Sequence, residues 1–473
     1  MALKTYDLII LGQGSAAFAA AIKADELGIN TVMVGGKATR GATIGGTCVN
    51  VGCVPSKNLI TVGNALHEPA RSAFRAIVYG RTKLDFRKMI AEKDALVRKF
   101  RKEKYVDVLK GLPNVEYVPE RGRFVSENEV KAGDQVLKAK RFLIATGAKA
   151  KPAPVKGAEG VEYLTNEEAL SLKELPGSMI VVGGRALGLE FAQMYSHFGT
   201  EVTVLQRSER ILPESEPEIS DALTGYLKDE GIEIQTGVNL KEVAQRGETR
   251  IVRCTVNGRE REFRADQLLF ATGRVPNTAH LDAQKAGVEL DADGFVRVNE
   301  EMQTSSAHVW AAGDVIGEPM LETIAAKEGA VAVNNAFRDS KKRIDFSEVP
   351  RAVFTSPEVA SVGLTDAEAN AKGIRCACGV LPLDLVPKAH IIGDTRGLIK
   401  LVADTKTKRV VGLHILAPHA ADLIHEGVLA VKFRLTIDDI IDTVHVFPTL
   451  SEAIKLAAQS FYRDVGKLSC CTE

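Results

Sequence analysis

The sequence predicts an α/β fold with two parallel-sheet βαβ units and a C-terminal α+β domain. Residues 6–34 and 177–207 share one order of features, an apolar strand, a glycine turn, a helix and a second strand. From about Val349 the pattern changes to short alternating strands followed by amphipathic helices. We expect Rossmann-like dinucleotide-binding domains over residues 1–150 (completed by 275–345) and 151–274, and a dimerisation domain over 346–473.

The composition is that of an ordinary globular protein and argues against several partner classes. Lysine plus arginine and aspartate plus glutamate each number 61, so a zero formal charge indicates neither nucleic acid nor an anionic membrane as partner. No uncharged apolar stretch of about 18 residues appears, so no membrane span is predicted. Seven cysteines, an odd number, argue against a disulfide framework. We expect a cytoplasmic protein.

The first glycine turn has the G-x-G-x-x-A form, with Gly12, Gly14 and Ala17 at the fixed positions. Its glycines let the backbone approach a pyrophosphate at the N-terminus of the following helix, where free N–H groups favour anions. The second strand should then end in an acid that binds a ribose hydroxyl, but Gly35 stands there. Either another group binds the ribose or water does.

The second glycine turn runs from Gly183 to Gly188 and carries Arg185 where a glycine is expected. Arg207 and Arg210 follow the next strand, which ends without an acid. Guanidinium groups suit a 2′-phosphate, so the pattern favours NADPH over NADH. The alternative is a solvated charged loop.

The stretch GGTCVNVGCVPSK, residues 45–57, is the most specific one in the chain. Cys48 and Cys53 are five positions apart, too far on an ideal helix for a disulfide. We therefore expect Cys48 in an irregular turn that opens a helix, where free amides and the helix dipole lower a thiol pKa. This arrangement predicts a reactive pair rather than two buried apolar cysteines.

Taken in order along the whole chain, these motifs resemble the flavoprotein disulfide reductase family. In that family two electrons pass from NADPH to FAD and then to a cysteine pair. The resemblance implies FAD and NADPH as cofactors, with Cys53 facing the flavin, Cys48 facing the substrate, and Lys57 paired with Glu190. It implies cofactor-binding roles for Gly12, Gly14, Ala17, Gly46, Thr47, Lys57, Gly147, Gly183, Gly188, Arg207, Arg210, Gly273, Asp314 and Glu322.

Near the C-terminus, FPTLSE (residues 447–452) departs from the HPT-x-SE pattern of the disulfide-reducing members. Disulfide reduction releases a thiolate that must be protonated, and an imidazole suits that task near pH 7. Phe447 replaces the imidazole, while Glu452 remains. His445 lies two positions earlier, where we expect its side chain to point elsewhere.

The closing segment contains a vicinal pair, Cys470 and Cys471. The Hg(II)-reducing members of the family, by resemblance, lack the histidine and end in such a pair. Hg(II) prefers thiolates, and its reduction requires electrons rather than a proton donor. The resemblance implies that the tail of one subunit delivers Hg(II), taken from small-thiol adducts, to Cys48 and Cys53 of the other, within a homodimer. These four cysteines are the expected metal-binding set and, with Lys57 and Glu190, the expected catalytic set.

Two alternatives remain open at this point. One is a large thioredoxin reductase-like enzyme with a C-terminal dithiol, against which Phe447 argues. The other is a flavoprotein that only binds soft metals, against which the retained dithiol, Lys57 and Glu190 argue. Cys376 and Cys378 form a C-x-C on a predicted strand, and we interpret them as packing residues, as we do Cys254. Many Hg(II)-reducing members begin with a small metal-binding domain, whereas here we expect the core form without one.

Overall fold

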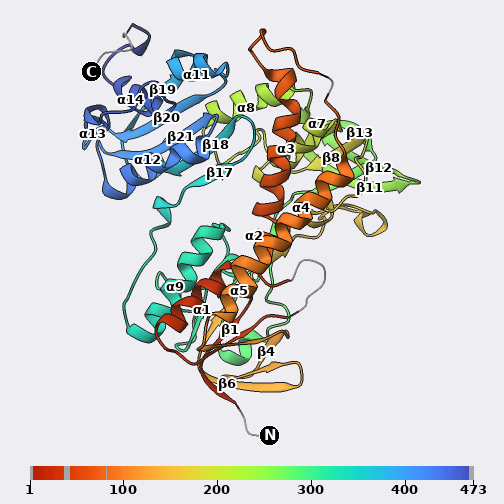
Figure 1. The fold of residues 1–473 in the computed structure, drawn as a ribbon, viewed down its shortest axis with the longest axis vertical. Helices are drawn as coiled ribbons and strands as arrows, with labels where there is room; N and C mark the ends of the chain where they lie inside the picture. The colour runs from red at the N-terminus through yellow and green to blue at the C-terminus, as the bar shows by residue number, and fades with distance from the viewer. Residues whose placement is uncertain (1–3, 37–42, 81, 468–473) are drawn as a thin grey trace.

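The computed structural model describes residues 4–36, 43–80 and 82–467. Figure 1 shows the first sheet at the bottom, the second nucleotide unit at the right and the C-terminal domain at the upper left. The long helices α3 (Cys53–Arg71) and α4 (Phe86–Arg101) run between the first unit and the second. Within the described ranges, no helix is both long and apolar enough to cross a membrane.

The first sheet has seven strands in the order β3-β2-β1-β6-β5-β4, with β16 also paired to β6. Its parallel part comprises β1 (Thr5–Leu11), β2 (Thr31–Val34), β3 (Val115–Val118), β6 (Gln135–Ile144) and β16 (Val309–Ala311). β4 (Gly122–Ser126) and β5 (Glu129–Ala132) extend it in antiparallel pairing. Because β16 lies beside β6, the chain returns to this sheet after the second unit.

Helices α1 (Ser15–Glu26) and α9 (Glu322–Arg338) pack closely against each other. A Cβ atom at Gly329 would lie 2.1 Å from the carbonyl oxygen of Ala16, so only glycine permits this contact. The contact fixes where α9 begins relative to the first glycine turn, which immediately precedes α1.

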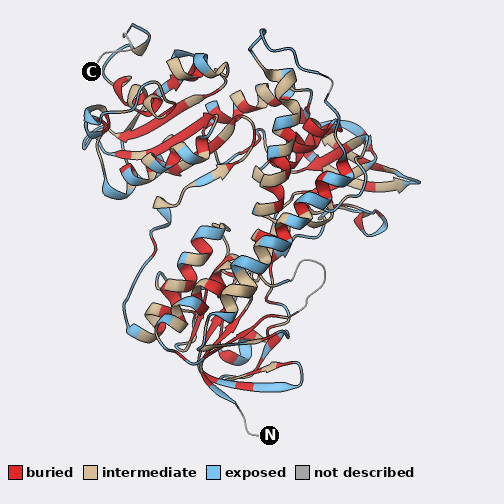
Figure 2. Ribbon diagram, viewed as in Figure 1, coloured by how far each residue is buried: buried red, intermediate tan, exposed pale blue. Residues whose placement is uncertain are grey.

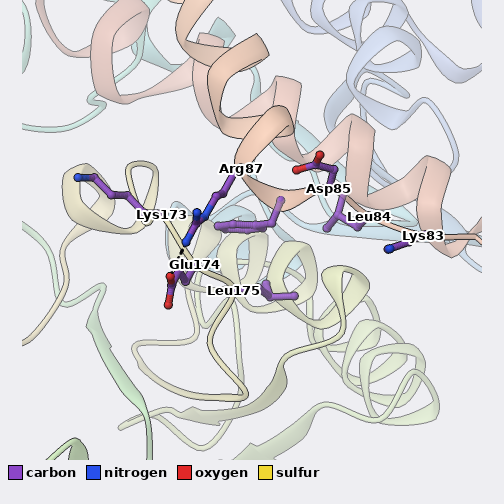
Figure 3. Close-up of a pocket in the computed structure, with 8 residues that line it drawn as sticks. Lys83, Leu84, Asp85, Arg87, Lys173, Glu174 and Leu175 are labelled. Atoms are coloured by element: carbon purple, nitrogen blue, oxygen red, sulfur yellow. Dashed lines mark hydrogen bonds and ion pairs between the residues drawn. The ribbon is translucent and has the colours of Figure 1, made fainter.

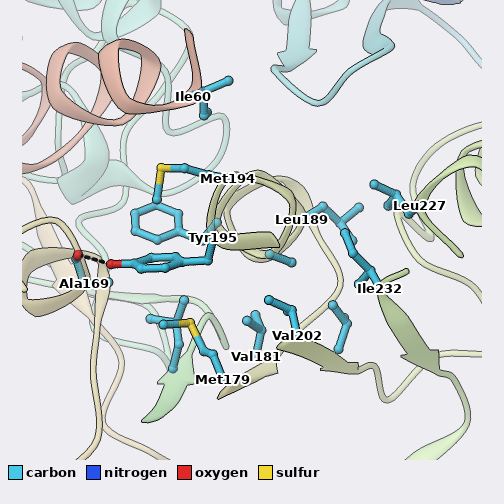
Figure 4. Close-up of a cluster of buried hydrophobic side chains, with 14 of the residues drawn as sticks. Ile60, Ala169, Met179, Val181, Leu189, Met194, Tyr195, Val202, Leu227 and Ile232 are labelled. Atoms are coloured by element: carbon cyan, nitrogen blue, oxygen red, sulfur yellow. Dashed lines mark hydrogen bonds between the residues drawn. The ribbon is translucent and has the colours of Figure 1, made fainter. Parts of the chain in front are cut away.

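The second unit has a parallel sheet in the order β10-β9-β8-β14 and a separate three-stranded antiparallel sheet. The strands are β8 (Ser178–Val182), β9 (Glu201–Leu205), β10 (Glu233–Gln235), β11 (Val238–Arg246), β12 (Thr249–Val256), β13 (Arg259–Ala265) and β14 (Gln267–Phe270). Helix α7 (Ala186–Phe198) follows the second glycine turn. Figure 4 shows its core, in which Tyr195 donates to the carbonyl of Ala169 and Ile60 of α3 approaches α7.

The segments that enter and leave the second unit lie side by side. β7 (Ala148–Ala150) pairs antiparallel with β15 (Arg274–Pro276). Each strand follows an Ala-Thr-Gly sequence, so the similarity between the two segments in the sequence corresponds to proximity in space. A capping box of Thr165 and Glu168 opens α6 (Asn166–Ala169).

The C-terminal domain is a five-stranded antiparallel sheet in the order β17-β18-β21-β20-β19, as the predicted α+β class requires. Its strands are β17 (Arg351–Val353), β18 (Glu358–Gly363), β19 (Cys376–Pro382), β20 (Leu398–Asp404) and β21 (Val410–Ala417). Its helices include α12 (Ala420–Phe433), α13 (Ile437–Asp442) and α14 (Glu452–Gln459). Figure 2 shows buried residues concentrated in the strands of the sheets, with exposed residues along α4.

The remaining α-helices are short or lie at the edges of these three parts. They are α2 (Gly46–Val51), α5 (Asp107–Lys110), α8 (Pro217–Asp229), α10 (Asp366–Ala371) and α11 (Pro387–Ile392).

Candidate active site

The cysteine pair lies where two helices meet. Cys48 belongs to the six-residue helix α2, and Cys53 is the first residue of α3. The expectation of an irregular turn around Cys48 is therefore wrong, because the break falls at Gly52, which has φ −128° and ψ −118°. A Cβ atom at Gly52 would lie 2.9 Å from the Thr47 carbonyl oxygen. The bend at Gly52 lets two residues five positions apart face each other.

The two thiols differ in acidity. A hydrogen bond from the Cys48 thiol, helped by the Lys57 charge and opposed by desolvation, lowers the pKa of Cys53 to about 7. The same hydrogen bond, in which Cys48 keeps its proton, is the main reason that the pKa of Cys48 is raised. Of the pair, Cys53 is thus the thiol that ionises first, near neutral pH.

Lys57 and Glu190 form the ion pair that the resemblance implied. Lys57 Nζ lies 2.7 Å from Glu190 Oε2 and 4.7 Å from the ring centroid of Phe354. The other carboxylate oxygen of the buried Glu190 accepts a hydrogen bond from the Phe354 backbone N–H at 3.0 Å. One carboxylate therefore joins the dithiol helix α3, the nucleotide-unit helix α7 and the start of the C-terminal domain.

The first glycine turn touches the dithiol segment directly. Gly14 is the N-cap of α1, and a Cβ atom at Gly46 would lie 2.6 Å from Gly14 Cα. The Gly45 N–H donates to the Gln13 carbonyl at 2.8 Å. The structure thus brings together Gly12, Gly14 and Ala17 with Gly46, Thr47 and the cysteines beyond them.

Arg274, which the sequence reasoning missed, connects several predicted positions. Its guanidinium donates to the Ala148 carbonyl at 2.6 Å and to Thr47 Oγ1 at 3.4 Å, and lies 3.5 Å from the Asp314 carboxylate. Burial raises the pKa of Asp314, and the Arg274 charge acts against that shift. The only signal for Arg274 in the sequence was its place directly after the second Ala-Thr-Gly repeat. The carbonyl of Gly273, the last residue of that repeat, accepts a hydrogen bond from the Lys151 N–H.

The threonines of the two Ala-Thr-Gly repeats indicate that a polar cofactor fits beside them. The side-chain oxygens of Thr146 and Thr272 are buried, and neither has a hydrogen-bond partner among the described residues. Buried hydroxyls are normally paired, so these two fit a bound polar molecule that supplies partners. Gly147, directly after Thr146, has φ +69°, and its carbonyl accepts from Asn277 N–H at 2.9 Å.

Helix α9 begins at Glu322, one of the residues to which the resemblance gave a cofactor-binding role. The Glu322 charge works against ionisation of both Cys48 and Cys53, so this helix start lies near the thiols. One turn and a half further on, the buried Glu328 accepts from the Gly313 N–H at 2.7 Å. Burial raises the pKa of Glu328 to about 7, and sequence reasoning gave no sign of this group.

The second glycine turn carries an exposed arginine. Arg185 is the N-cap of α7, and its exposed side chain lies 3.7 Å from Glu214. Gly188 is required by packing, because a Cβ atom there would lie 1.8 Å from the Gly183 carbonyl oxygen. Arg207 is exposed, whereas Arg210 is paired with Asp221 at 3.0 Å. The structure therefore leaves Arg207 the less constrained of the two predicted phosphate-binding arginines.

Phe447 is half-exposed, and His445 does not replace the missing imidazole within this chain. His445 Nε2 lies 3.0 Å from Glu426 Oε1, and its Nδ1 lies 2.9 Å from the Thr443 carbonyl. Both ring nitrogens thus face acceptors, and the Glu426 carboxylate raises the pKa of His445. Glu452, the first residue of α14, has a buried Oε2 with no hydrogen-bond partner among the described residues.

The three other cysteines among the described residues lie away from this site. Cys376 and Cys378 are on β19, where the Cys376 thiol donates to Asp366 Oδ1 at 3.0 Å. Burial is the main cause that raises the pKa of Cys376 to about 11 and that of Cys378 to about 12. Cys254 is buried in β12. Cys470 and Cys471 lie outside the described residues.

A surface groove and a histidine cluster lie outside the predicted site and contain none of its residues. The groove, shown in Figure 3, has a volume of 470 Å³, lies between residues 83–87 and 173–175, and is crossed by an ion pair of Arg87 and Glu174. His67 of α3 and His197 of α7 stack at 4.2 Å, and Glu230 lies 3.1 Å from His197. Because the Glu230 carboxylate also accepts from Gln193 and Arg396, we interpret this cluster as a polar contact between α3, α7 and α8.

Comparisons with known proteins agree with this architecture. Residues 6–329 match the pyridine nucleotide-disulphide oxidoreductase family, and residues 349–458 match its dimerisation domain. The dimerisation domain implies a homodimer. Members of this family typically use FAD and a nicotinamide dinucleotide.

Relatives along almost the whole chain include several enzymes. The chain is 42% identical over 466 residues to the mercuric reductase of Lysinibacillus sphaericus, covering 98% of this chain and 84% of that protein. It is 39% identical over 472 residues to the mercuric reductase of Streptomyces lividans, covering 98% of each. It is 36% identical over 465 residues to the dihydrolipoyl dehydrogenase of Thermus scotoductus, covering 98% of each.

Among solved structures, the Cu(II) complex of the HOCl-induced flavoprotein disulfide reductase RclA from Escherichia coli is similar, with a TM-score of 0.87 at 25% identity. That match covers 98% of this chain and all of the other. With its paired nucleotide units, dithiol and dimerisation domain, the chain belongs to the pyridine nucleotide-disulphide oxidoreductase family.

Proposed function

We propose that this protein reduces Hg(II) to elemental mercury with electrons from NADPH, using FAD and the Cys48–Cys53 pair. The observation that carries the proposal is Phe447. An exposed phenyl ring stands where a disulfide reductase of this family has its proton donor, and the nearby His445 is held by Glu426. The relatives named mercuric reductases support the same substrate.

The substrate chemistry suits a dithiol without a proton donor. Hg(II) arrives bound to two thiolates and exchanges ligands with protein thiolates, since soft cations prefer sulfur. Two electrons then convert Hg(II) to Hg(0) and release both sulfur ligands as thiolates. A disulfide substrate also takes two electrons, but the leaving thiolate must receive a proton in the site, which Phe447 cannot give.

The proposed roles of the chain's own residues combine these contacts with the family resemblance. Cys53, with its pKa of about 7, is the first thiolate available, and Cys48 keeps the proton. We assign the incoming ligand to Cys48 on the resemblance. Lys57, tied to Glu190 at 2.7 Å, holds a positive charge beside the developing thiolate. FAD, when bound, supplies the two-electron step between NADPH and the dithiol. Arg207 is the side chain that we propose for the 2′-phosphate, with Arg210 in support.

The tail is part of the proposal. Cys470 and Cys471 of one subunit would take Hg(II) from small-thiol adducts and pass it by ligand exchange to Cys48 and Cys53 of the partner. A vicinal pair suits such exchange, because an unstrained disulfide between adjacent cysteines does not form easily.

A substrate comparison tests the proposal. NADPH oxidation is measured with Hg(II) in excess small thiol, and separately with lipoamide, glutathione disulfide and thioredoxin. We expect turnover with Hg(II) and little with the disulfides. Turnover with a disulfide but not with Hg(II) would favour a thioredoxin reductase-like or dihydrolipoyl dehydrogenase-like enzyme. A flavin-loaded protein that oxidises NADPH with none of them would favour a soft-metal-binding flavoprotein.

The tail is tested by replacing Cys470 and Cys471 together with alanine. The double variant should keep reduction of its flavin by NADPH but lose Hg(II) turnover when strong thiol ligands compete. Replacing Cys376 and Cys378 together is the matched control and should leave turnover unchanged. Equal turnover of the tail variant and the wild type would remove the tail from the mechanism.

A further inference from the structure

Gly35 directly follows β2, at the position where a dinucleotide-binding unit places an acid for a ribose hydroxyl. The space beside it is occupied by another side chain. A Cβ atom at Gly35 would lie 2.6 Å from Gln13 Cβ and 2.7 Å from Gln13 Oε1. With Gln13 in this rotamer, there is no room for an acidic side chain at position 35. The Gln13 carboxamide occupies the space that the acidic side chain would fill.

The Gln13 side chain is fixed by its neighbours. Tyr117 Oη, on the adjacent strand β3, lies 2.7 Å from both Gln13 Oε1 and the Gly35 carbonyl oxygen. Gln13 Nε2 donates to the Gly36 carbonyl at 3.2 Å. The carboxamide therefore lies across the C-terminal end of β2, half-buried, at the first glycine turn.

The second unit also pairs one glutamine with one glycine at this place, but there the glycine lies in the turn and the glutamine follows the strand. The Gly12 N–H donates to the last residue of β2, Val34, and the Gly183 N–H donates to the last residue of β9, Leu205, both at 2.9 Å. Gly184 therefore corresponds to Gln13, and Gln206 corresponds to Gly35. Gln206 Oε1 accepts from the Gly184 N–H at 2.8 Å, and a Cβ atom at Gly184 would meet Gln206 Cβ at 3.1 Å.

In each unit, therefore, the space between the glycine turn and the end of the strand holds one glutamine side chain. The glutamine comes from the turn in the first unit and from the residue after the strand in the second. Gln206 is buried and bonded inward, whereas Gln13 is partly exposed. Only the first unit therefore presents its carboxamide at the surface of the turn.

From this placement we propose that Gln13 is the ribose-binding residue for the adenosine half of the dinucleotide held at the first glycine turn, which is FAD in this family. A carboxamide has both a donor and an acceptor, so it can pair with a ribose hydroxyl in either direction, while a carboxylate can only accept. The proposal concerns cofactor binding alone and does not depend on the metal substrate.

A competition experiment on the full-length holoenzyme tests this proposal. The protein is incubated with equal excess concentrations of FAD and a deoxy analogue lacking the adenosine 2′- or 3′-hydroxyl, until the bound composition is constant. The protein is then isolated, and the released flavins are quantified by chromatography. We expect wild-type protein to prefer FAD over one of the two analogues by about fivefold, the ratio expected for one neutral hydrogen bond.

The Gln13→Ala variant should bind FAD and that analogue in a ratio near one, because the contact to the hydroxyl is gone. Gln206→Ala, the matched change in the second unit, should keep the wild-type ratio. An unchanged preference in Gln13→Ala, no preference in the wild type for either hydroxyl, or an equal loss in Gln206→Ala would each overturn the proposal. Because each measurement is a ratio within one sample, partial loss of folded protein does not change it.

Discussion

The low pKa of Cys53 depends mainly on its neighbour rather than on the nearby positive charge. The hydrogen bond from the Cys48 thiol is the largest cause of the shift to about 7, and Lys57 is a smaller one. Replacing Cys48 with alanine should therefore return the Cys53 pKa to about 9 or above. Lys57→Met should raise it less.

The size of the effect on reactivity follows from these values. At pH 7 a thiol with a pKa near 7 is about half ionised, whereas one with a pKa near 9 is about 1% ionised. Since the thiolate is the nucleophile, alkylation of Cys53 at pH 7 should be about 50-fold slower in Cys48→Ala. Above about pH 10 the two proteins should react at similar rates.

The assay is the rate of iodoacetamide alkylation of reduced protein from about pH 5.5 to pH 10, followed for the Cys53 peptide by mass spectrometry. Cys48 and Cys53 share the tryptic peptide that ends at Lys57, so fragment ions within that peptide assign the label to Cys53, and peptide mass separates it from the other five cysteines. A larger shift in Lys57→Met than in Cys48→Ala would contradict the assignment of the hydrogen bond as the leading cause. A wild-type midpoint above about 8.5, the ordinary range of a thiol, would contradict it as well.

Three further predictions follow from the same contacts. Glu190→Ala leaves Lys57 without its partner and the Phe354 N–H unsatisfied, so urea unfolding should show a loss of about 2–3 kcal/mol. His445 has a raised folded pKa, so its stabilising pair is fully present below the unfolded pKa of about 6.5 and is lost as the pH rises through the folded pKa. His445→Gln should therefore destabilise the protein more at pH 6 than at pH 9, in the same urea measurement. Arg207→Ala should raise the KM for NADPH several-fold and leave the KM for NADH unchanged in steady-state kinetics.

Local patterns were enough to predict the strand-turn-helix units. Glycine turns, apolar periodicity and capping residues act over a few positions, so the sequence states them directly. The Lys57–Glu190 pair was expected only through the resemblance, since its members are 133 positions apart, and the structure has it.

The same reasoning could not supply contacts between distant segments. The helical state of Cys48 was missed for a local reason, because the break falls at Gly52 and not at Cys48. Arg274 gained its importance only when β15 came beside β7. The sequence marked Gly35 as lacking an acid, but it could not show that Gln13, 22 positions earlier, fills that space.

The central claim is that the electrons of NADPH end on mercury. The most direct measurement is the amount of elemental mercury vapour released per NADPH oxidised, in the absence of oxygen, with Hg(II) supplied as its complex with a small thiol. We predict one Hg(0) for each NADPH, as the two-electron balance requires, and no vapour from Cys48→Ala. NADPH oxidation without release of mercury vapour would contradict the account.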